Sequence, residues 1–218
     1  MSKIAVYFMP GLAANPKIFE RISLPESTFE IIFLEWEIPL IGETLLDYAE
    51  RMSKKVTHEN AVLVGVSFGG VIVQEMAKFI KVKKVIIISS VKSNLELPPF
   101  MRLAKKMKLY KILPTGLVQN LEQKVQRFVG NQLKERLHLY EKYLSVRNKQ
   151  YLDWSIYQLL FWEQTSPIEN IIHIQGDQDK TFPIKYIQNC IVVKGGTHVM
   201  ILNRYKWFND NLPKLILK

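Results

Sequence analysis

The apolar residues of this chain gather in short continuous runs, separated by longer segments of mixed polarity. Six runs rich in Val, Ile, Leu and Phe predict strands that are covered on both faces. They span residues 4–9, 29–34, 61–66, 84–89, 171–175 and 190–194. Between the runs, apolar residues recur at helical spacing. One such series consists of Leu45, Tyr48, Ala49, Met52 and Val56. Strands that alternate with helices indicate βαβ units and a mainly parallel sheet.

The alternation stops between residues 93 and 166, where only helical patterns occur, interrupted by prolines and glycines. We therefore predict a helical cap subdomain at residues 93–166. It is inserted between two sheet strands of a core formed by residues 1–92 and 167–218. A closing helix is predicted over residues 204–212, interrupted or ended by Pro213.

Size and composition fit one globular domain with an insertion. The chain has 218 residues, of which 48% are hydrophobic and 23% charged. No apolar run approaches the roughly 18 residues of a membrane span. The short run at the start fits a first strand better than a secretory signal. The single cysteine, Cys190, cannot form an internal disulfide. These features favour a cytoplasmic protein without a transmembrane segment.

Basic residues are concentrated in the predicted cap. The chain carries 30 Lys and Arg against 20 Asp and Glu, and residues 91–166 carry 13 against 6. Such a charge attracts an anionic substrate, a membrane surface or nucleic acid, and the simplest alternative is a solvated basic face. A basic helix around residues 100–113 is compatible with a membrane surface, although a solvated cap helix is the simpler interpretation. No recognition helix, aromatic platform or zinc-ligand spacing accompanies the charge, so we expect neither a nucleic-acid partner nor a metal.

Residues 65–69, Gly-Val-Ser-Phe-Gly, follow the third apolar run directly. They match the Gly-x-Ser-x-Gly nucleophile elbow, a sharp turn between a strand and a helix. The serine at the apex holds a strained backbone, and the positions two before and two after approach other backbone too closely for a β-carbon. Ser67 is therefore the candidate nucleophile. The alternative is an ordinary glycine-rich turn.

A serine hydroxyl needs a general base, and four histidines are available. They are His58, His138, His173 and His198. His198 follows Gly-Gly-Thr just beyond the last strand. Loops after parallel strands gather at one edge of the sheet, where Ser67 also lies. His198 is therefore the candidate base, whereas His173, inside a strand, is expected to be a core residue.

The segment Gly-Asp-Gln-Asp after the fifth strand supplies a candidate acid to orient the imidazole. Asp179 is the first choice and Asp177 the alternative. A further possibility is that both carboxylates only cap a turn.

The order Ser67, Asp179, His198 resembles that of the α/β-hydrolase superfamily. Residues 176–183 resemble the Gly-x-x-Asp-x-x-x-Pro segment of the family, and residues 195–198 resemble its glycine-rich approach to the catalytic histidine. The resemblance covers nearly the whole chain. It implies a three-layer α/β fold with about six strands and a helical cap.

The loop at residues 10–12, Pro-Gly-Leu, stands where the family has its His-Gly-x oxyanion loop. By that match, the N–H groups of Leu12 and Phe68 would form the oxyanion hole. The chain departs from the family in carrying Pro10 in place of the histidine. It also starts at what would be the third strand of the family.

The resemblance implies a serine hydrolase that acts on a carboxylic ester or related acyl substrate through an acyl-enzyme, without metal or organic cofactor. The cap aromatics Trp154, Tyr157 and Phe161 are candidate substrate-pocket residues, which favours an apolar substrate, and the alternative is that they form the core of the cap. The basic cap is compatible with an anionic group, such as a coenzyme A thioester. Esters, thioesters, amides and carbon–carbon bonds all remain open as targets. The alternative function is a non-catalytic ligand-binding or interaction protein that retains the fold.

Overall fold

The computed structural model describes residues 3–112, 115 and 141–218. Its centre is a sheet of six strands, all parallel, in the order β2-β1-β3-β4-β5-β6. The strands are β1 (Ile4–Met9), β2 (Phe29–Phe33), β3 (Val62–Val66), β4 (Lys84–Ile88), β5 (Ile171–Gly176) and β6 (Ile191–Val193). Each predicted strand is present, with bounds that differ from the sequence pattern by no more than one residue at either end. The prediction of a parallel α/β fold is confirmed.

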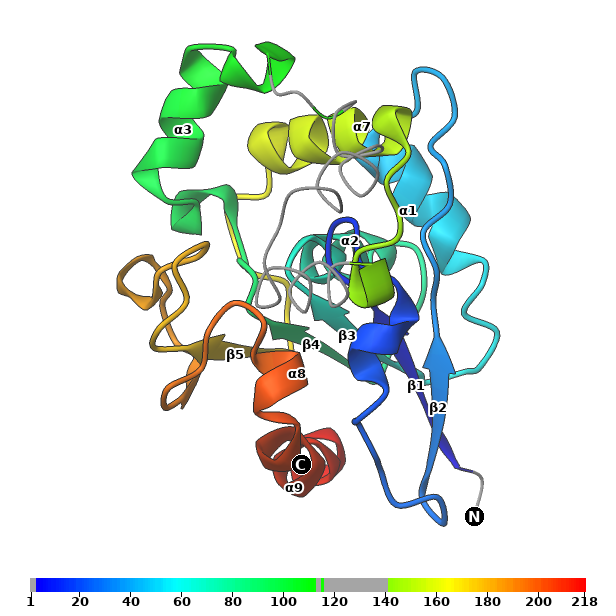
Figure 1. Cartoon of the computed structure of the whole chain (residues 1–218). Helices are drawn as coiled ribbons and strands as arrows, with labels where there is room; N and C mark the ends of the chain where they lie inside the picture. The colour runs from blue at the N-terminus through cyan, green and yellow to red at the C-terminus, as the bar shows by residue number, and fades with distance from the viewer. Residues whose placement is uncertain (1–2, 113–114, 116–140) are drawn as a thin grey trace.

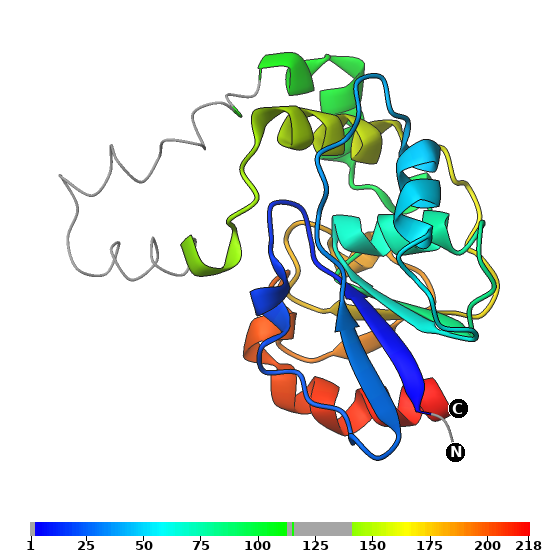
Figure 2. The ribbon, with the colours of Figure 1, turned by 90° about the vertical axis from the view of Figure 1, so that its right-hand side faces the viewer.

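Helices cover both faces of the sheet (Figures 1 and 2). They are α1 (Leu45–Ser53), α2 (Phe68–Met76), α3 (Pro99–Lys106), α7 (Lys149–Phe161), α8 (Met200–Asn203) and α9 (Tyr205–Leu217). Single 3₁₀ turns are η1 (Pro16–Phe19), η2 (Asn94–Glu96), η3 (Leu109–Ile112) and η4 (Ile184–Tyr186). Helices α1, α2 and α7 share one hydrophobic core with the sheet, and η1, α8 and α9 share the other.

Alternate residues of the central strands enter opposite cores, which explains the continuous apolar runs. Leu63 of β3 packs with α1 and α2, whereas its neighbours Val62 and Val64 pack toward α8 and α9. All three side chains are fully buried. A strand buried on both faces has no position for a polar residue, so it shows no alternation in the sequence.

The first helix begins at a capping box. The Thr44 hydroxyl accepts a hydrogen bond from the Asp47 N–H, and the Asp47 carboxylate accepts one from the Thr44 N–H. The helix ends at Ser53, so Val56 lies beyond it, although the apolar series continues that far.

The last helix does not stop at Pro213, and the prediction that it ends or breaks there is wrong. Helix α9 runs through the proline to Leu217. Phe208, Leu212 and Ile216 recur every four residues and are fully buried against the sheet. Burial of three large side chains is worth roughly 1.5–3 kcal/mol each, which outweighs the ~3 kcal/mol penalty of an interior proline.

The described residues between β4 and β5 form helices and turns and contain no strand. In both ribbon views α7 lies above the end of the sheet at which α2 begins, and α3 packs beside α7 (Figures 1 and 2). Part of the predicted cap, including His138, lies outside the described residues. Within the described ranges, no helix is long and apolar enough to cross a membrane.

Candidate active site

Ser67 occupies a strained turn between β3 and α2. Its φ of 54° and ψ of −122° fall where residues with a β-carbon are rarely found. Hydrogen bonds hold this backbone from both sides. The Ser67 N–H donates to the Ile88 carbonyl at 2.9 Å, and the Ser67 carbonyl accepts from the Gly70 N–H at 2.9 Å and the Ser90 hydroxyl at 2.7 Å. The surrounding fold therefore enforces the conformation that exposes the serine side chain.

The two glycines of the elbow pattern are required by close backbone contacts. A β-carbon on Gly65 would lie 2.4 Å from the Gly69 carbonyl oxygen. One on Gly69 would lie 2.3 Å from the Pro10 carbonyl oxygen. The next loop residue, Gly11, is also close, because a β-carbon there would lie 3.3 Å from that of Ser67. The elbow and the loop after β1 are thus in direct contact.

A second pair of glycines joins the loops after β5 and β6. A β-carbon on Gly176 would lie 2.1 Å from the Gly196 carbonyl oxygen, which also accepts a 2.9 Å hydrogen bond from the Gln178 N–H. The Asp177 carboxylate accepts from the Gly195 N–H at 2.7 Å. Asp177, the alternative acid, therefore braces the loop that leads to the histidine.

The structure brings together Ser67, Asp179 and His198, the three residues that the sequence singles out. His198 Nε2 lies 3.0 Å from Ser67 Oγ, and His198 Nδ1 lies 2.9 Å from Asp179 Oδ2. A carboxylate can only accept, so Nδ1 carries the proton and the Nε2 lone pair faces the hydroxyl. In this tautomer the imidazole is able to take a proton from the serine.

Asp179 is buried and fully hydrogen-bonded. Its Oδ1 accepts from the Thr181 N–H at 2.8 Å and the Phe182 N–H at 3.0 Å, and its Oδ2 also accepts from Gln175 Nε2 at 3.0 Å. Burial alone would raise the pKa of this carboxyl, but the hydrogen bonds from His198 and from the two backbone N–H groups outweigh burial and lower it. Asp179 therefore stays negatively charged in the interior.

The sequence analysis missed Gln175, which is fully buried beneath Asp179. Its Nε2 also donates to the Phe182 carbonyl at 2.7 Å, and its Oε1 lies 3.2 Å from His173 Nε2. His173 is a buried core residue, as predicted, and burial lowers its pKa to about 4, so it is neutral near pH 7. The signal that could have found Gln175 is an amide inside a strand that is apolar apart from His173.

The two N–H groups expected to form an oxyanion hole lie on the segments that meet at Ser67. Phe68 is the first residue of α2, and Leu12 follows Gly11. Within the described part of the chain, neither N–H donates to a protein acceptor. Both N–H groups are therefore available to donate a hydrogen bond to an oxyanion.

Two aromatic residues brace the loop after β1, and the sequence analysis missed both. Trp36 Nε1 donates to the Gly11 carbonyl at 2.9 Å, and its ring stacks on Phe68 with 5.5 Å between centroids. The Tyr151 hydroxyl of α7 accepts from the Ala13 N–H at 3.2 Å. These contacts support the loop that carries Pro10.

Ring contacts divide the three candidate pocket residues of α7. Trp154 lies beside the elbow helix, because its ring centroid is 6.1 Å from that of Phe68, and its Nε1 donates to the Glu43 carbonyl at 2.7 Å. Tyr157 and Phe161 stack on each other at 4.4 Å and pack against Tyr110 of η3. Trp154 thus lies beside Phe68, the residue that follows Ser67, and the other two belong to the contact between η3 and α7.

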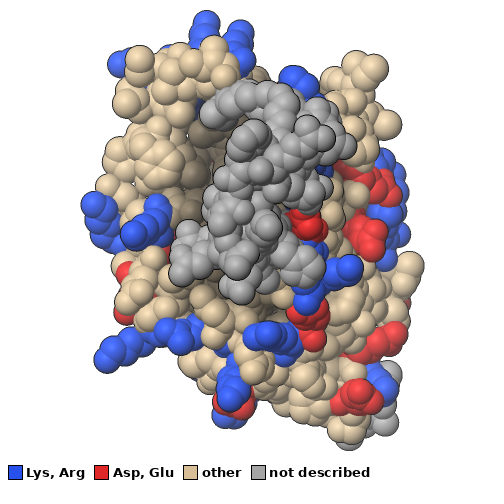
Figure 3. Space-filling view, viewed as in Figure 1, with Lys and Arg blue, Asp and Glu red and all other residues tan. Residues whose placement is uncertain are grey.

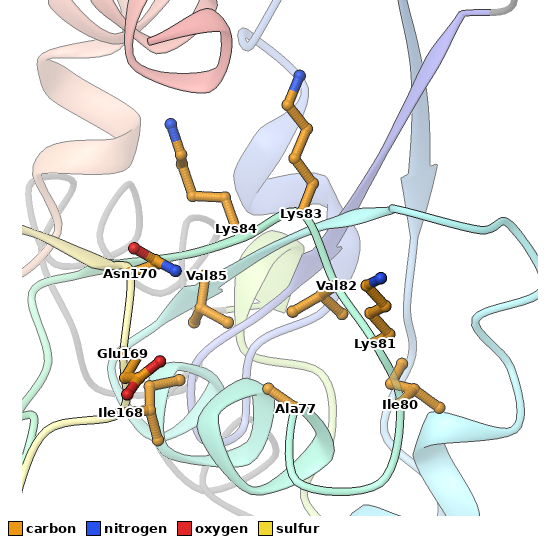
Figure 4. Close-up of a pocket in the computed structure, with 10 residues that line it drawn as sticks. All are labelled: Ala77, Ile80, Lys81, Val82, Lys83, Lys84, Val85, Ile168, Glu169 and Asn170. Carbon is orange, nitrogen blue, oxygen red and sulfur yellow. The ribbon is translucent and has the colours of Figure 1, made fainter.

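A cavity of about 280 Å³ lies at the other end of the strands, beside the first residues of β4 and the segment that leads into β5 (Figure 4). Its lining includes Ala77 and Ile168, and the amino groups of Lys83 and Lys84 point away from these two residues. It is separate from the elbow. In the described ranges, no group of three or more His, Cys, Asp or Glu residues is arranged to hold a metal.

The chain has the α/β-hydrolase fold. It is similar to an esterase from Exiguobacterium antarcticum, with a TM-score of 0.70, 16% identity, and coverage of 100% of this chain and 93% of the other. A bromoperoxidase from Bacillus anthracis gives a TM-score of 0.64 at 18% identity, and the match covers 100% of this chain and 93% of the bromoperoxidase. A putative lipase from Acinetobacter baumannii gives a TM-score of 0.68 at 14% identity, and the match covers 99% of this chain and 84% of the lipase. No protein-family model and no curated protein sequence matches the chain.

Proposed function

We propose that this protein is a serine hydrolase that cleaves a carboxylic ester or a related acyl substrate through an acyl-enzyme. Ser67 is the nucleophile, His198 the general base and Asp179 the acid that orients it. The observation that carries the proposal is the unbroken hydrogen-bond series from Ser67 Oγ through the imidazole to the buried carboxylate, with distances of 3.0 and 2.9 Å. Esterases among the proteins of similar fold support it.

In the first half of the reaction, Ser67 Oγ attacks the acyl carbon while its proton moves to His198 Nε2. The carbonyl electron pair moves onto the oxygen, and the N–H groups of Leu12 and Phe68 donate hydrogen bonds to this oxyanion. One such donor is often worth ~3 kcal/mol of transition-state stabilisation. When the oxyanion collapses, His198 gives its proton to the leaving group, and the acyl group remains on Ser67.

In the second half, water replaces the leaving group. His198 takes a proton from the water as its oxygen attacks the acyl carbon, and then returns a proton to Ser67 Oγ. Asp179 remains ionised throughout and stabilises the imidazolium that forms in each half. Neither half requires a metal or an organic cofactor.

The apolar part of the substrate is proposed to lie between the elbow and the cap, with Trp154 nearest to the reacting atoms and Tyr157 and Phe161 farther out on α7. The described part of the predicted cap, residues 93–112, 115 and 141–166, carries more Lys and Arg than Asp and Glu. An anionic group on the substrate is therefore compatible with the site.

Labelling with a fluorophosphonate probe and hydrolysis of a graded series of nitrophenyl esters and acyl thioesters test the proposal. We expect mass spectrometry to find the probe on Ser67, and we expect Ser67→Ala to abolish labelling and lower turnover at least ~10⁴-fold. Ser23→Ala, at an exposed serine, is the matched control and should behave as wild type. A wild-type protein that is neither labelled nor active on any of these compounds would instead be a binding protein with this fold.

A further inference from the structure

An apolar stripe on α3 faces solvent. Phe100, Leu103 and Met107 recur at helical spacing and are each more than half exposed, and none of the residues of α3 is buried. The stripe continues into η3, where Ile112 is 75% exposed. A helix that served only to close the cap would turn such a stripe inward.

The same segment is strongly basic. Between residues 97 and 112 it carries five cations and no acidic residue. One cation, Lys105, lies over the Phe161 ring at 4.5 Å. The others are exposed, and they are Arg102, Lys106, Lys108 and Lys111. At helical spacing Arg102 and Lys106 fall on the side of α3 next to the apolar stripe.

A second element exposes apolar residues at the same end of the molecule. In the loop before α1, Leu40 is 63% and Ile41 is 99% exposed. Hydrogen bonds tie this loop to α7, because Gln150 Nε2 donates to the Pro39 carbonyl and Trp154 Nε1 to the Glu43 carbonyl, both at 2.7 Å. The loop is therefore held with these side chains outward.

Both ribbon views place this loop and the α3–η3 segment at the upper end of the molecule, beyond α7, with α9 at the opposite end (Figures 1 and 2). We call residues 38–42 and 99–112 together the cap-end surface. On the face seen in Figure 3, Lys and Arg lie along this end beside uncharged surface, whereas Asp and Glu appear only lower down.

We propose that the cap-end surface binds membranes that contain anionic lipid. Its exposed Ile, Leu, Phe and Met side chains enter the boundary between headgroups and acyl chains, and its lysines and arginine contact lipid phosphates. A nucleic acid would use the cations but gain nothing from Leu40, Ile41 or Ile112, so the combination favours lipid. The binding does not depend on the proposed hydrolase activity.

Sedimentation with phosphatidylcholine vesicles, with and without about one third phosphatidylglycerol, tests the proposal on the full chain. We expect binding to the anionic vesicles and little binding to the neutral ones. Lys106→Ala combined with Lys111→Ala should weaken binding about thirtyfold, since each cation near such a surface contributes about 1 kcal/mol. Ile41→Ser combined with Ile112→Ser should weaken it at least roughly tenfold. All four side chains are exposed, so folding should be unaffected.

Matched controls come from α9 at the other end of the molecule. Lys206→Ala with Lys214→Ala, and Leu217→Ser, replace exposed residues of the same types and should leave vesicle binding unchanged. Ser67→Ala should also bind vesicles as wild type does. Equal losses in the α9 variants would overturn the proposal, as would an absence of binding to anionic vesicles. It would also be overturned if only the lysine variants lost binding and heparin bound as well as lipid, because the surface would then bind polyanions.

Discussion

Replacing Asp179 with Asn is the sharpest test of how the candidate site is oriented. The amide oxygen of the new residue keeps the hydrogen bonds from the Thr181 and Phe182 N–H groups, now at 2.8 and 3.0 Å from Oδ1. The NH₂ group then takes the place of Oδ2. There it faces Gln175 Nε2 at 3.0 Å and His198 Nδ1 at 2.9 Å.

The two contacts of this NH₂ group have different consequences. Gln175 Nε2 is also a donor, and its amide cannot turn over without losing the Phe182 carbonyl and His173, so a buried donor loses its partner. We expect the free energy of unfolding to fall by about 1–3 kcal/mol. At His198 the NH₂ donates to Nδ1, which moves the imidazole proton to Nε2. A protonated Nε2 cannot accept the Ser67 proton, so turnover should fall ~10⁴-fold.

Asp177→Asn is the matched control. Asp177 is exposed, and the hydrogen bond that its side chain accepts from the Gly195 N–H uses a single oxygen, which asparagine retains. Ester turnover and urea unfolding should both stay close to wild type in this variant. If Asp179→Asn kept more than about a tenth of the turnover, or if Asp177→Asn lost as much, the assignment of the acid would be wrong.

Two further predictions concern stability. Burial lowers the pKa of His173 from 6.5 to about 4, so the unfolded chain takes up the proton first as the pH falls. The free energy of unfolding should therefore drop by up to about 3 kcal/mol as the pH falls from 6.5 to about 4. Urea unfolding of His173→Gln should show a smaller drop over the same pH range, and an equal drop would refute the reasoning. Gly69→Ala places a β-carbon 2.3 Å from the Pro10 carbonyl oxygen and should cost more than ~2 kcal/mol. Gly42→Ala, whose β-carbon meets nothing within 4 Å, should cost only ~1 kcal/mol from its positive φ, and equal losses in the two variants would contradict the steric argument.

The strands and the candidate triad were predictable because both leave local patterns. A strand covered on two faces is a continuous apolar run, as in β3 and β4. Close backbone contacts require glycine, so the elbow and the loop before His198 are both marked in the sequence by glycines at fixed positions. Parallel topology then places the three loops at one edge of the sheet.

What the sequence analysis missed depends on contacts between distant segments. Trp36 meets Gly11 across 25 positions and Tyr151 meets Ala13 across 138, and no local spacing encodes either pairing. The predicted end of α9 was wrong for a similar reason, since burial of Leu212 and Ile216 outweighs the tendency of Pro213 to end a helix. The aromatic residues of α7 share one helix but contact different partners, which spacing alone does not reveal.

The strand β6 contains three residues and, among the described strands, pairs only with β5, yet the loop that follows it carries His198. In the proposed mechanism, the Ser67 hydroxyl has no proton acceptor until β6 has joined the sheet, because the loop after that strand carries His198, 131 positions further along the chain. On that mechanism, a polypeptide whose strands β1 to β5 are paired but whose β6 is not would lack turnover. In a refolding experiment, recovery of turnover would therefore report the pairing of β6 with β5. Measurements of compactness or helix content would not detect this step.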